Sequence, residues 1–175
     1  MTRPRILSSV AARIHGARHH HHYGGSQAEA SRESGLTSDP LVATWDDVRR
    51  IALSLPETSE KLAWGLPSWR VRRKLFVWER PLRDADLESL GDDAPQGEIL
   101  GARVEDLLAK EALIETEPAI FTTPHFDGYP AVLVELDEIE LDVLEEIIVE
   151  AWLCRAPRRI ARAFMEAHGL SQRDE

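Results

Sequence analysis

The stretch 119–136 constrains the fold more than any other part of this sequence. Two runs rich in apolar residues, 119–123 and 131–136, flank a seven-residue loop in which Asp127 is followed by Gly128. An Asp-Gly pair is a strong turn signal, because glycine accepts a positive φ without steric cost. The stretch therefore predicts two strands that are joined by a tight hairpin loop.

Three more strands are predicted upstream of this hairpin. In 68–72, the apolar Trp69 and Val71 alternate with arginines, so one face of the strand is apolar and the other is basic. The runs 75–78 and 99–104 are apolar enough for central strands. The predicted connections are a loop at 57–67, a turn at Arg73-Lys74, and the segment 80–97, which is expected to form a loop or a short helix.

The first helix is predicted to begin at Thr44. The Thr44 side chain can cap the free amides of the first turn, and Asp47 follows three residues later, where an acid favours the positive end of the helix. Apolar residues then recur at helical spacing until Pro56 stops the pattern.

Two further helices follow the same logic. A short helix is predicted over 105–113, with Leu107 and Leu108 facing inward. The longest helix is expected to start with a capping box formed by Asp137 and Glu140. Its predicted buried stripe comprises Ile139, Val143, Ile147, Ala151 and Trp152.

The final helix is predicted to have Pro157 in its first turn and Gly169 at its end. The resulting order of elements, α-β-β-β-α-β-β-α-α, indicates an α+β protein. We expect a two-layer sandwich in which the helices pack on one face of a mostly antiparallel five-stranded sheet.

A single domain is expected over 42–168, because 175 residues are enough for one ordinary domain and too few for two. The segment 1–41 is predicted to be disordered and 169–175 to be a flexible C-terminus. Arginines outnumber lysines by 18 to 3, which is typical of a GC-rich genome, and we hypothesise that the true start lies near Val42. The His19–His22 tract could bind a metal ion, but it has no preorganised shell.

The charge of the chain limits the classes of function. The formal net charge is -10, and residues 1–40 contain five Arg and three acids, so residues 41–175 carry -12. Such a domain does not favour nonspecific binding to nucleic acid or anionic membranes, although a local basic patch can still act. No apolar run approaches the roughly 18 residues that span a bilayer. We expect a bacterial, cytoplasmic protein with no membrane partner, no cofactor and no metal site.

Several segments together carry a resemblance to a known family. They are Ser54-Leu-Pro-Glu-Thr-Ser-Glu, the region from Trp69 to Trp78, Phe121-Thr-Thr-Pro-His-Phe-Asp-Gly-Tyr-Pro-Ala-Val-Leu-Val, and Glu150-Ala-Trp-Leu-Cys-Arg-Ala-Pro. Over about residues 44–165 the chain resembles the MmcQ/YjbR family. The resemblance implies a two-layer α/β fold similar to the frataxin-like and secretion-chaperone-like architectures, and it implies DNA binding. It supplies no catalytic residues, and the usual start of family members at the equivalent of Val42 favours the start hypothesis.

Two basic clusters give the DNA-binding hypothesis its candidate residues. Arginines can grip phosphates, and an exposed aromatic ring beside them could stack on a base. The first cluster comprises Arg70, Arg72, Arg73 and Lys74, near Trp69 and Trp78, and the second comprises Arg155, Arg158, Arg159 and Arg162. The alternative is that the strand arginines only form a solvent-exposed face, while the helical arginines pair with the surplus acids. DNA binding requires the two clusters to converge on one face.

The hairpin loop gives a second hypothesis, in which a cleft beside 121–130 binds a small molecule or a protein partner. Its candidate residues are Trp69, Thr122, Thr123, His125, Asp127 and Tyr129. These groups could hydrogen-bond a ligand, or His125 could act as a general base oriented by Asp127. The alternative is structural, because the same residues suit a turn, a strand and the sealing of a sheet edge.

Catalysis is not expected. Cys154, the only cysteine, lies late in an amphipathic helix and is expected to be a buried structural thiol. Nucleophile-elbow, phosphate-loop and zinc-type motifs are missing from the sequence. The acids of the longest helix could bind iron or a partner, or could simply be solvated. We expect a non-enzymatic, monomeric DNA-binding protein, with ligand or partner binding beside the hairpin as the alternative.

Overall fold

The computed structural model describes residues 42–170. The predicted disordered tail 1–41, with its His19–His22 tract, and residues 171–175 lie outside the described residues. Leu170, which the sequence places in the flexible C-terminus, is buried and packs in the main hydrophobic core. The packed part of the chain therefore extends at least to Leu170.

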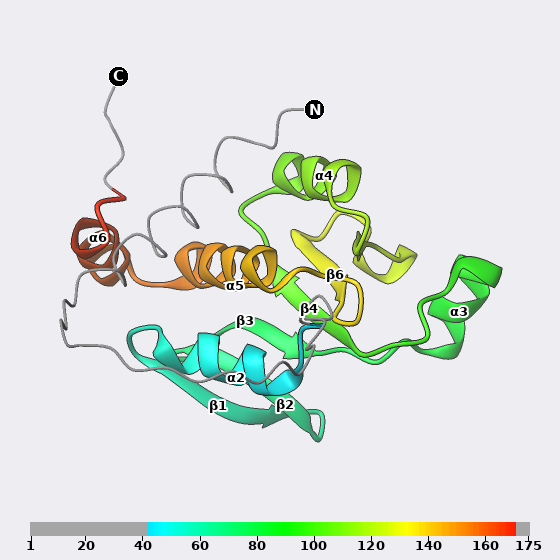
Figure 1. Cartoon of the computed structure of the whole chain (residues 1–175), viewed down its shortest axis with the longest axis horizontal. Helices are drawn as coiled ribbons and strands as arrows, with labels where there is room; N and C mark the ends of the chain where they lie inside the picture. The colour runs from blue at the N-terminus through cyan, green and yellow to red at the C-terminus, as the bar shows by residue number, and fades with distance from the viewer. Residues whose placement is uncertain (1–41, 171–175) are drawn as a thin grey trace, which may run out of the picture.

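A six-stranded sheet with strand order β1-β2-β3-β4-β6-β5 forms the framework, and every strand pair is antiparallel (Figure 1). The strands are β1 (Thr58–Ala63), β2 (Leu66–Val71), β3 (Lys74–Glu79), β4 (Ile99–Arg103), β5 (Ile120–Phe121) and β6 (Ala131–Glu135). The arrangement confirms the α+β prediction, with six strands instead of five.

The additional strand is β1, which occupies most of the segment 57–67 that the sequence predicts as a loop. That prediction is wrong, and the reason is the position of β1 at the edge of the sheet. Its sequence TSEKLA is largely polar, because an edge strand that packs only partly against the core needs no apolar alternation. Trp64 and Gly65 form the two-residue turn from β1 to β2, and Ala63 pairs with Leu66 across it.

The turn between β2 and β3 lies one residue earlier than predicted. It consists of Arg72 and Arg73, and Arg72 adopts a φ of 54°. Lys74 is already the first residue of β3 and pairs with Val71.

A bulge in β3 decides which aromatic side chains share a face of the sheet. Trp69 pairs with Val77 and Arg70 pairs with Leu75, so Phe76 has no partner of its own in β2. Because a bulge places one extra residue on one strand, the side-chain alternation is shifted there. Trp69 and Val77 consequently belong to the main core, whereas Leu75 packs in a second apolar cluster on the other face.

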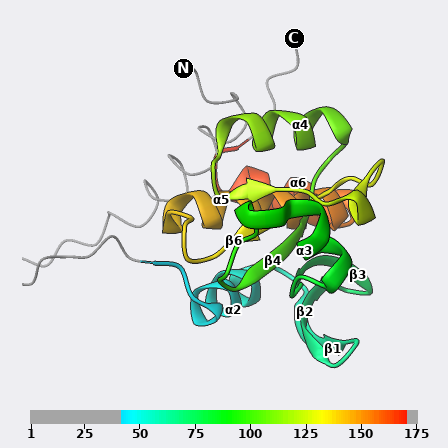
Figure 2. The same ribbon diagram turned by 90° about the vertical axis from the view of Figure 1, so that its right-hand side faces the viewer.

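The helices leave one face of the sheet partly uncovered. They are α2 (Trp45–Ser54), α3 (Asp84–Leu90), α4 (Leu107–Thr116), α5 (Leu141–Arg155) and α6 (Arg158–Ala167), and single 3₁₀ turns lie at Gly91–Asp93 and Pro124–Phe126. The helix α5 packs on β3 and β4, and α2 packs on α5 and β1. Figure 1 shows α2 and α5 against the sheet, and Figure 2 shows the β1–β2 hairpin projecting at the lower edge of the molecule. We call the other side of the sheet the open face.

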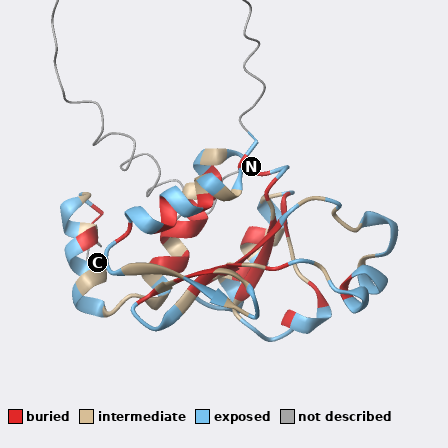
Figure 3. Ribbon diagram, turned by 90° about the horizontal axis from the view of Figure 1, so that it is seen from below, coloured by how far each residue is buried: buried red, intermediate tan, exposed pale blue. Residues whose placement is uncertain are grey.

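The main core lies between the sheet and these two helices, and buried residues gather along their inward sides in Figure 3. The predicted stripe of the longest helix is confirmed, since Ile139, Val143, Ile147, Ala151 and Trp152 are all buried. Trp152 is fully buried, and its indole Nε1 donates a hydrogen bond to the carbonyl oxygen of Pro56 at 3.1 Å. This bond satisfies the one polar group of the ring and ties α5 to the end of α2.

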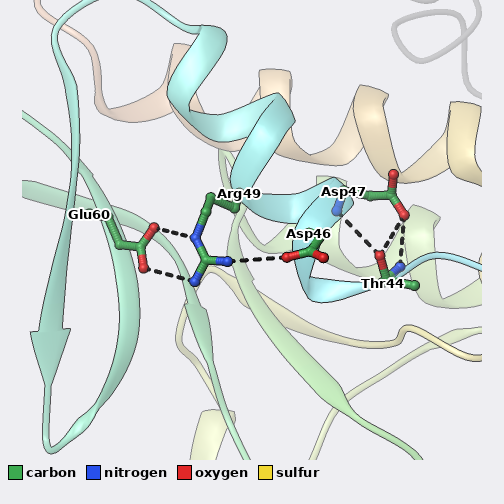
Figure 4. A network of polar contacts seen from close by, with 5 residues as sticks. All are labelled: Thr44, Asp46, Asp47, Arg49 and Glu60. Atoms are coloured by element: carbon green, nitrogen blue, oxygen red, sulfur yellow. Dashed lines mark hydrogen bonds and ion pairs between the residues drawn. The ribbon is translucent and has the colours of Figure 1, made fainter.

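The start of α2 matches the sequence prediction. The Thr44 hydroxyl accepts a hydrogen bond from the Asp47 amide at 3.4 Å, and an Asp47 carboxylate oxygen accepts one from the Thr44 amide at 3.0 Å, which completes a capping box (Figure 4). In the same network Arg49 holds Glu60 of β1 through two hydrogen bonds of 2.8 and 3.1 Å. The pair therefore fastens the edge strand to the helix layer.

The inward face of α4 is not the predicted one. Leu107 and Leu108 are 44% and 75% exposed, while Lys110 and Leu113 are buried. The Asp106 carboxylate accepts a hydrogen bond from the Ala109 amide and so starts the helix at Leu107. This start turns the first two leucines outward, so the prediction for them is wrong.

The helices α5 and α6 also begin differently from the prediction. The helix α5 begins at Leu141 after Glu140, which makes no side-chain cap, so the capping box expected from Asp137 and Glu140 is missing. Pro157 occupies the N-cap of α6 instead of its first turn. Gly169 follows the end of α6 with a φ of 64°, which fits the predicted glycine stop.

Candidate functional site

A cleft of about 660 Å³ opens on the open face of the sheet. It lies between the β1–β2 turn, the segment after β3, and the hairpin loop that joins β5 to β6. Its floor contains Trp78 and Phe126, which are each 6% exposed and whose ring centroids lie 6.4 Å apart. Trp64 and Tyr129 stand at its rim and are 82% and 47% exposed. The cleft is therefore an aromatic cavity with a buried floor and an exposed rim.

The floor depends on a glycine in the neighbouring strand. Trp78 pairs with Gly101, and a Cβ on Gly101 would lie 2.4 Å from Cε2 of the indole. Only a residue without a side chain lets the ring lie so close to the β4 backbone. Gly101 thus fixes the position of the Trp78 ring.

The hairpin loop is held by a buried lysine that the sequence did not single out. Lys110 of α4 is 6% exposed, and its Nζ donates hydrogen bonds to the carbonyl oxygens of Phe126 at 2.6 Å and Tyr129 at 3.1 Å. Desolvation lowers the pKa of Lys110, and the nearby Asp127 carboxylate acts in the opposite direction. Gly128 has a φ of 71°, as expected from the Asp-Gly turn. The loop is accordingly shaped by its own turn and by α4.

A buried ion pair forms the opposite wall. Arg80 and Asp86 are joined at 2.8 Å, with side-chain exposures of 7% and 4%. The Arg80 guanidinium also donates to the Pro81 carbonyl and lies 5.4 Å from the centre of the Phe126 ring. Burial acts to raise the pKa of Asp86, but hydrogen bonds from the Arg83 amide and the Arg80 guanidinium hold it below its ordinary value. In this wall the buried charges of Arg80 and Asp86 satisfy each other.

Trp64 combines exposure with an unfavourable backbone conformation. It adopts a φ of 52°, and Gly65 follows with a φ of 82°. Two consecutive positive φ values are typical of a type I′ hairpin turn, where asparagine and glycine are preferred. A bulky residue at positive φ is uncommon and costs of the order of 1 kcal/mol. Trp64 therefore places a large apolar side chain at the cleft, although its backbone conformation is unfavourable.

Only some of the predicted ligand residues line the cleft. His125, Asp127 and Tyr129 line the cleft. Thr122 is half-buried and Thr123 is buried, and neither lines the cleft. His125 meets the Phe126 ring edge-on at 4.9 Å, and the described residues show no hydrogen bond between His125 and Asp127. The loop therefore contributes contact groups, and a base oriented by an acid is not formed.

Trp69 does not belong to this site, which corrects its place among the candidate ligand residues. It is 1% exposed and stacks on Trp45 at 6.3 Å on the helix-covered side. The β3 bulge is the reason, because it places Trp69 on the opposite face from Trp78.

One arginine of each predicted basic cluster interacts with the same acid. Arg72 forms an ion pair with Glu57, and Arg159 of α6 lies close enough to interact with the same carboxylate. The hydrogen bond from Arg72 lowers the pKa of Glu57, and the charge of Arg159 adds to this effect. Arg70 is half-buried and donates to the carbonyl of Arg73 at 3.2 Å. The cations with exposed side chains in these clusters are Arg72, Arg73, Lys74, Arg158, Arg159 and Arg162.

A second, smaller cleft of about 250 Å³ lies between α4 and α5. Desolvation and the neighbouring Glu105 raise the pKa of Glu150 in this cleft to about 7. Cys154 is exposed at the surface, in contrast to the buried thiol that the sequence predicts. Neighbouring groups nonetheless desolvate its sulfur and, with Glu150, raise the pKa of Cys154 to about 12. A thiol with such a pKa is not activated as a nucleophile.

Sequence reasoning missed Trp64, Arg80, Asp86 and Lys110. The one usable signal was Trp64-Gly65, since a glycine between two strands marks a turn. Arg80 and Asp86 lie in a polar segment that predicts no buried ion pair, and no sequence pattern pointed to a buried role for Lys110. Within residues 42–170 no group of three or more His, Cys, Asp or Glu side chains is placed to hold a metal ion. None of the helices in this range has the length and apolar composition to cross a bilayer.

The fold and the site define a two-layer α+β domain with a ligand-sized aromatic cleft on the uncovered face of its sheet. The chain belongs to the YjbR family, whose model matches residues 53–154. The resemblance seen in the sequence is thereby confirmed.

Similar proteins support this assignment. The chain is 54% identical over 132 residues to the uncharacterized protein Rv2570 of Mycobacterium tuberculosis, which covers 73% of this chain and all of the relative. The uncharacterized protein Mb2600 of Mycobacterium bovis matches equally. The crystal structure of the Deinococcus radiodurans protein DR2400, which has a DUF419 domain, matches with a TM-score of 0.50 and 18% identity over 77% of this chain and 94% of that chain. At this identity the structural match supports the fold alone.

Proposed function

We propose that this protein is a binding module and that the aromatic cleft on the open face holds a small-molecule ligand. The observation that carries the proposal is Trp64. A tryptophan that is 82% exposed, in a strained turn, at the rim of a cavity of about 660 Å³ has no role in packing the core. Strained backbone and exposed aromatic side chains are features of binding sites.

The size and the rigidity of the cleft favour this function. Pockets for small molecules have volumes of roughly 300–1,000 Å³ and combine apolar walls with a few polar groups. Trp78 is fixed by Gly101, and the hairpin loop is fixed by Lys110. Because these groups are held in place before a ligand arrives, little conformational entropy is lost on binding.

We propose binding without catalysis. A general base needs a partner that orients it, and the described residues show no such hydrogen bond for His125. The buried Arg80–Asp86 pair is fully engaged in the wall, and the thiol of Cys154 has a raised pKa. The monomeric state and the cytoplasmic location stay predictions.

A thermal-shift screen of small aromatic compounds tests the proposal. Ligands that bind the cleft raise the melting temperature of the wild-type protein by mass action. The Trp64→Asn variant should lose these shifts, because it lacks the rim side chain. As a matched control, Leu108→Asn replaces another exposed apolar side chain, 75% exposed on α4, and should keep them. Hits whose shifts are the same in wild type and in Trp64→Asn would contradict binding in this cleft.

DNA binding is the second candidate, and the interaction of one arginine from each basic cluster with Glu57 favours it. The segment that joins β2 to β3 and the helix α6 supply exposed cations near one carboxylate. A phosphate could replace that carboxylate as the partner of Arg72.

Fluorescence anisotropy with duplex DNA at several salt concentrations tests this candidate. The logarithm of affinity should fall linearly with that of salt, and replacing both Arg158 and Arg162 by Gln should reduce the slope by about two. Glu57→Gln should raise the affinity, because it removes the competing carboxylate. No binding at low salt, or a slope that these variants leave unchanged, would contradict the candidate.

A further inference from the structure

We infer that the ligand of the open-face cleft is a planar molecule that carries an anionic group. This inference rests on the proposed function of the cleft and specifies its ligand class. Four features support it: the charges of the strand positions on the open face, the engagement of Asp86 and Glu79 away from the cleft, the unpaired guanidinium of Arg83, and the arrangement of the aromatic side chains.

The charged strand positions of β1, β2 and β3 on the open face are all cationic. Lys61 pairs with Ser68, which pairs with Trp78, so all three side chains point to the open face. Arg70 pairs with Leu75, which packs in the apolar cluster of the same face. Arg80 follows the last residue of β3, and its guanidinium lies over the Phe126 ring. No acid occupies an open-face position in these three strands, although residues 41–175 carry a charge of -12.

Two of the acids near the cleft, Asp86 and Glu79, do not present a free charge to it, whereas Asp127 does. Asp86 is paired with Arg80. Asp127 lines the cleft, is exposed and forms no ion pair within residues 42–170, although its charge acts on the buried ammonium of Lys110. Glu79 borders the cleft, but it pairs with Leu100 of the main core, so its side chain alternates to the helix-covered side.

One cation at the cleft has no acidic partner. Arg83 lines the cleft and is exposed, and it forms no ion pair within residues 42–170. The Arg83 amide donates a hydrogen bond to the Asp86 carboxylate, but the Arg83 guanidinium has no acidic partner. A guanidinium donates two parallel hydrogen bonds to a carboxylate, sulfonate or phosphate, and this geometry selects an anionic group.

The aromatic side chains select a flat body. Trp78 and Phe126 form a buried floor, and Trp64 at the rim presents an exposed indole. Aromatic rings bind flat partners by offset stacking or edge-on contact. A planar ligand can lie between the β1–β2 turn and the hairpin loop and reach Arg83 with its charged group.

Two fluorescent dyes test the inference. 8-Anilinonaphthalene-1-sulfonate is an anion with a flat naphthalene ring, and N-phenyl-1-naphthylamine has the same ring system without the sulfonate. The wild-type protein should bind the sulfonate dye about tenfold more tightly, as expected for one charge-assisted contact. Arg83→Gln should remove this difference and leave the affinity for the neutral dye unchanged. The control Arg50→Gln makes the same charge change on α2 and should preserve the preference for the sulfonate dye.

The outcomes separate the two proposals. Equal affinities for the two dyes, or a preference that survives Arg83→Gln, would overturn the inference of an anionic ligand while leaving the cleft as a binding site. Dye binding that Trp64→Asn leaves unchanged would instead contradict the cleft itself. A preference for the sulfonate dye that is lost in Arg83→Gln and retained in Arg50→Gln would support both.

Discussion

The indole of Trp78 lies against the backbone of Gly101, so closely that a Cβ on Gly101 would come within 2.4 Å of the ring. The two residues are partners across β3 and β4, and the contact places a large aromatic ring flat on the open face. The floor of the cleft therefore depends on a position where the chain has no side chain.

Gly101→Ala should displace the Trp78 ring. The added methyl group cannot fit, so the variant should be less stable by about 1–3 kcal/mol, as for other overpacked sites. It should also bind the sulfonate dye more weakly. Urea unfolding and the Trp78 indole resonance provide the measurements. An unshifted resonance together with unchanged stability would show that the ring is not held by this contact.

Trp64→Asn should separate stability from binding. Asparagine followed by glycine is the preferred pair for a type I′ turn, so the free energy of unfolding should rise by about 1 kcal/mol. Ligand affinity should fall, because the rim loses its indole. Chemical denaturation and dye titration on the same samples measure both quantities. If the variant is less stable than the wild type, Trp64 supports the fold and the argument from strain fails.

Lys110→Met should loosen the hairpin loop. The substitution leaves the carbonyl oxygens of Phe126 and Tyr129 without their buried donor, which should cost about 2–3 kcal/mol. Hydrogen exchange should accelerate at the loop amides that follow Thr123. Lys74→Met is the control, since it makes the same change at an exposed position and should alter neither quantity. Equal effects of the two variants would contradict the anchoring role of Lys110.

Glu150→Gln should change how stability depends on pH. The pKa of Glu150 is raised to about 7, so the folded state binds the proton more tightly than the unfolded state. The wild type therefore loses stability as the pH rises from about 4.5 to 7, and the glutamine variant lacks this loss. Because the side chain is partly exposed, the variant should be more stable at pH 8 by about 1–2 kcal/mol, and the difference should shrink toward pH 4. A constant difference across this range would refute the assignment.

The elements with strong local signals could be predicted from the sequence. The capping box at Thr44, the buried stripe through Ile147 and the Asp127-Gly128 loop each follow from local chemistry. The strand β1 could not be predicted, because an edge strand that packs little against the core has no apolar alternation. The orientation of α4 depends on where Asp106 caps it, and a shift of one or two residues turns the helix to another face.

The candidate site was predicted only in part, for a geometric reason. Its groups come from the β1–β2 turn, β3, the segment before α3 and the hairpin loop, which are distant in sequence. Local patterns identified His125 and Tyr129 because they lie in the loop itself. The β3 bulge then places Trp69 and Trp78 on opposite faces of the sheet, and no local sequence pattern predicts that bulge.

The five tryptophans allow the most direct test of the account, because two line the cleft and three lie elsewhere. We would titrate the protein with 8-anilinonaphthalene-1-sulfonate and follow the five indole N–H resonances by ¹H–¹⁵N NMR. The resonances of Trp64 and Trp78 should shift, while those of Trp45, Trp69 and Trp152 should stay in place. Shifts confined to the three tryptophans outside the cleft, or no shift at Trp64 and Trp78 when the dye is bound, would contradict binding in the cleft.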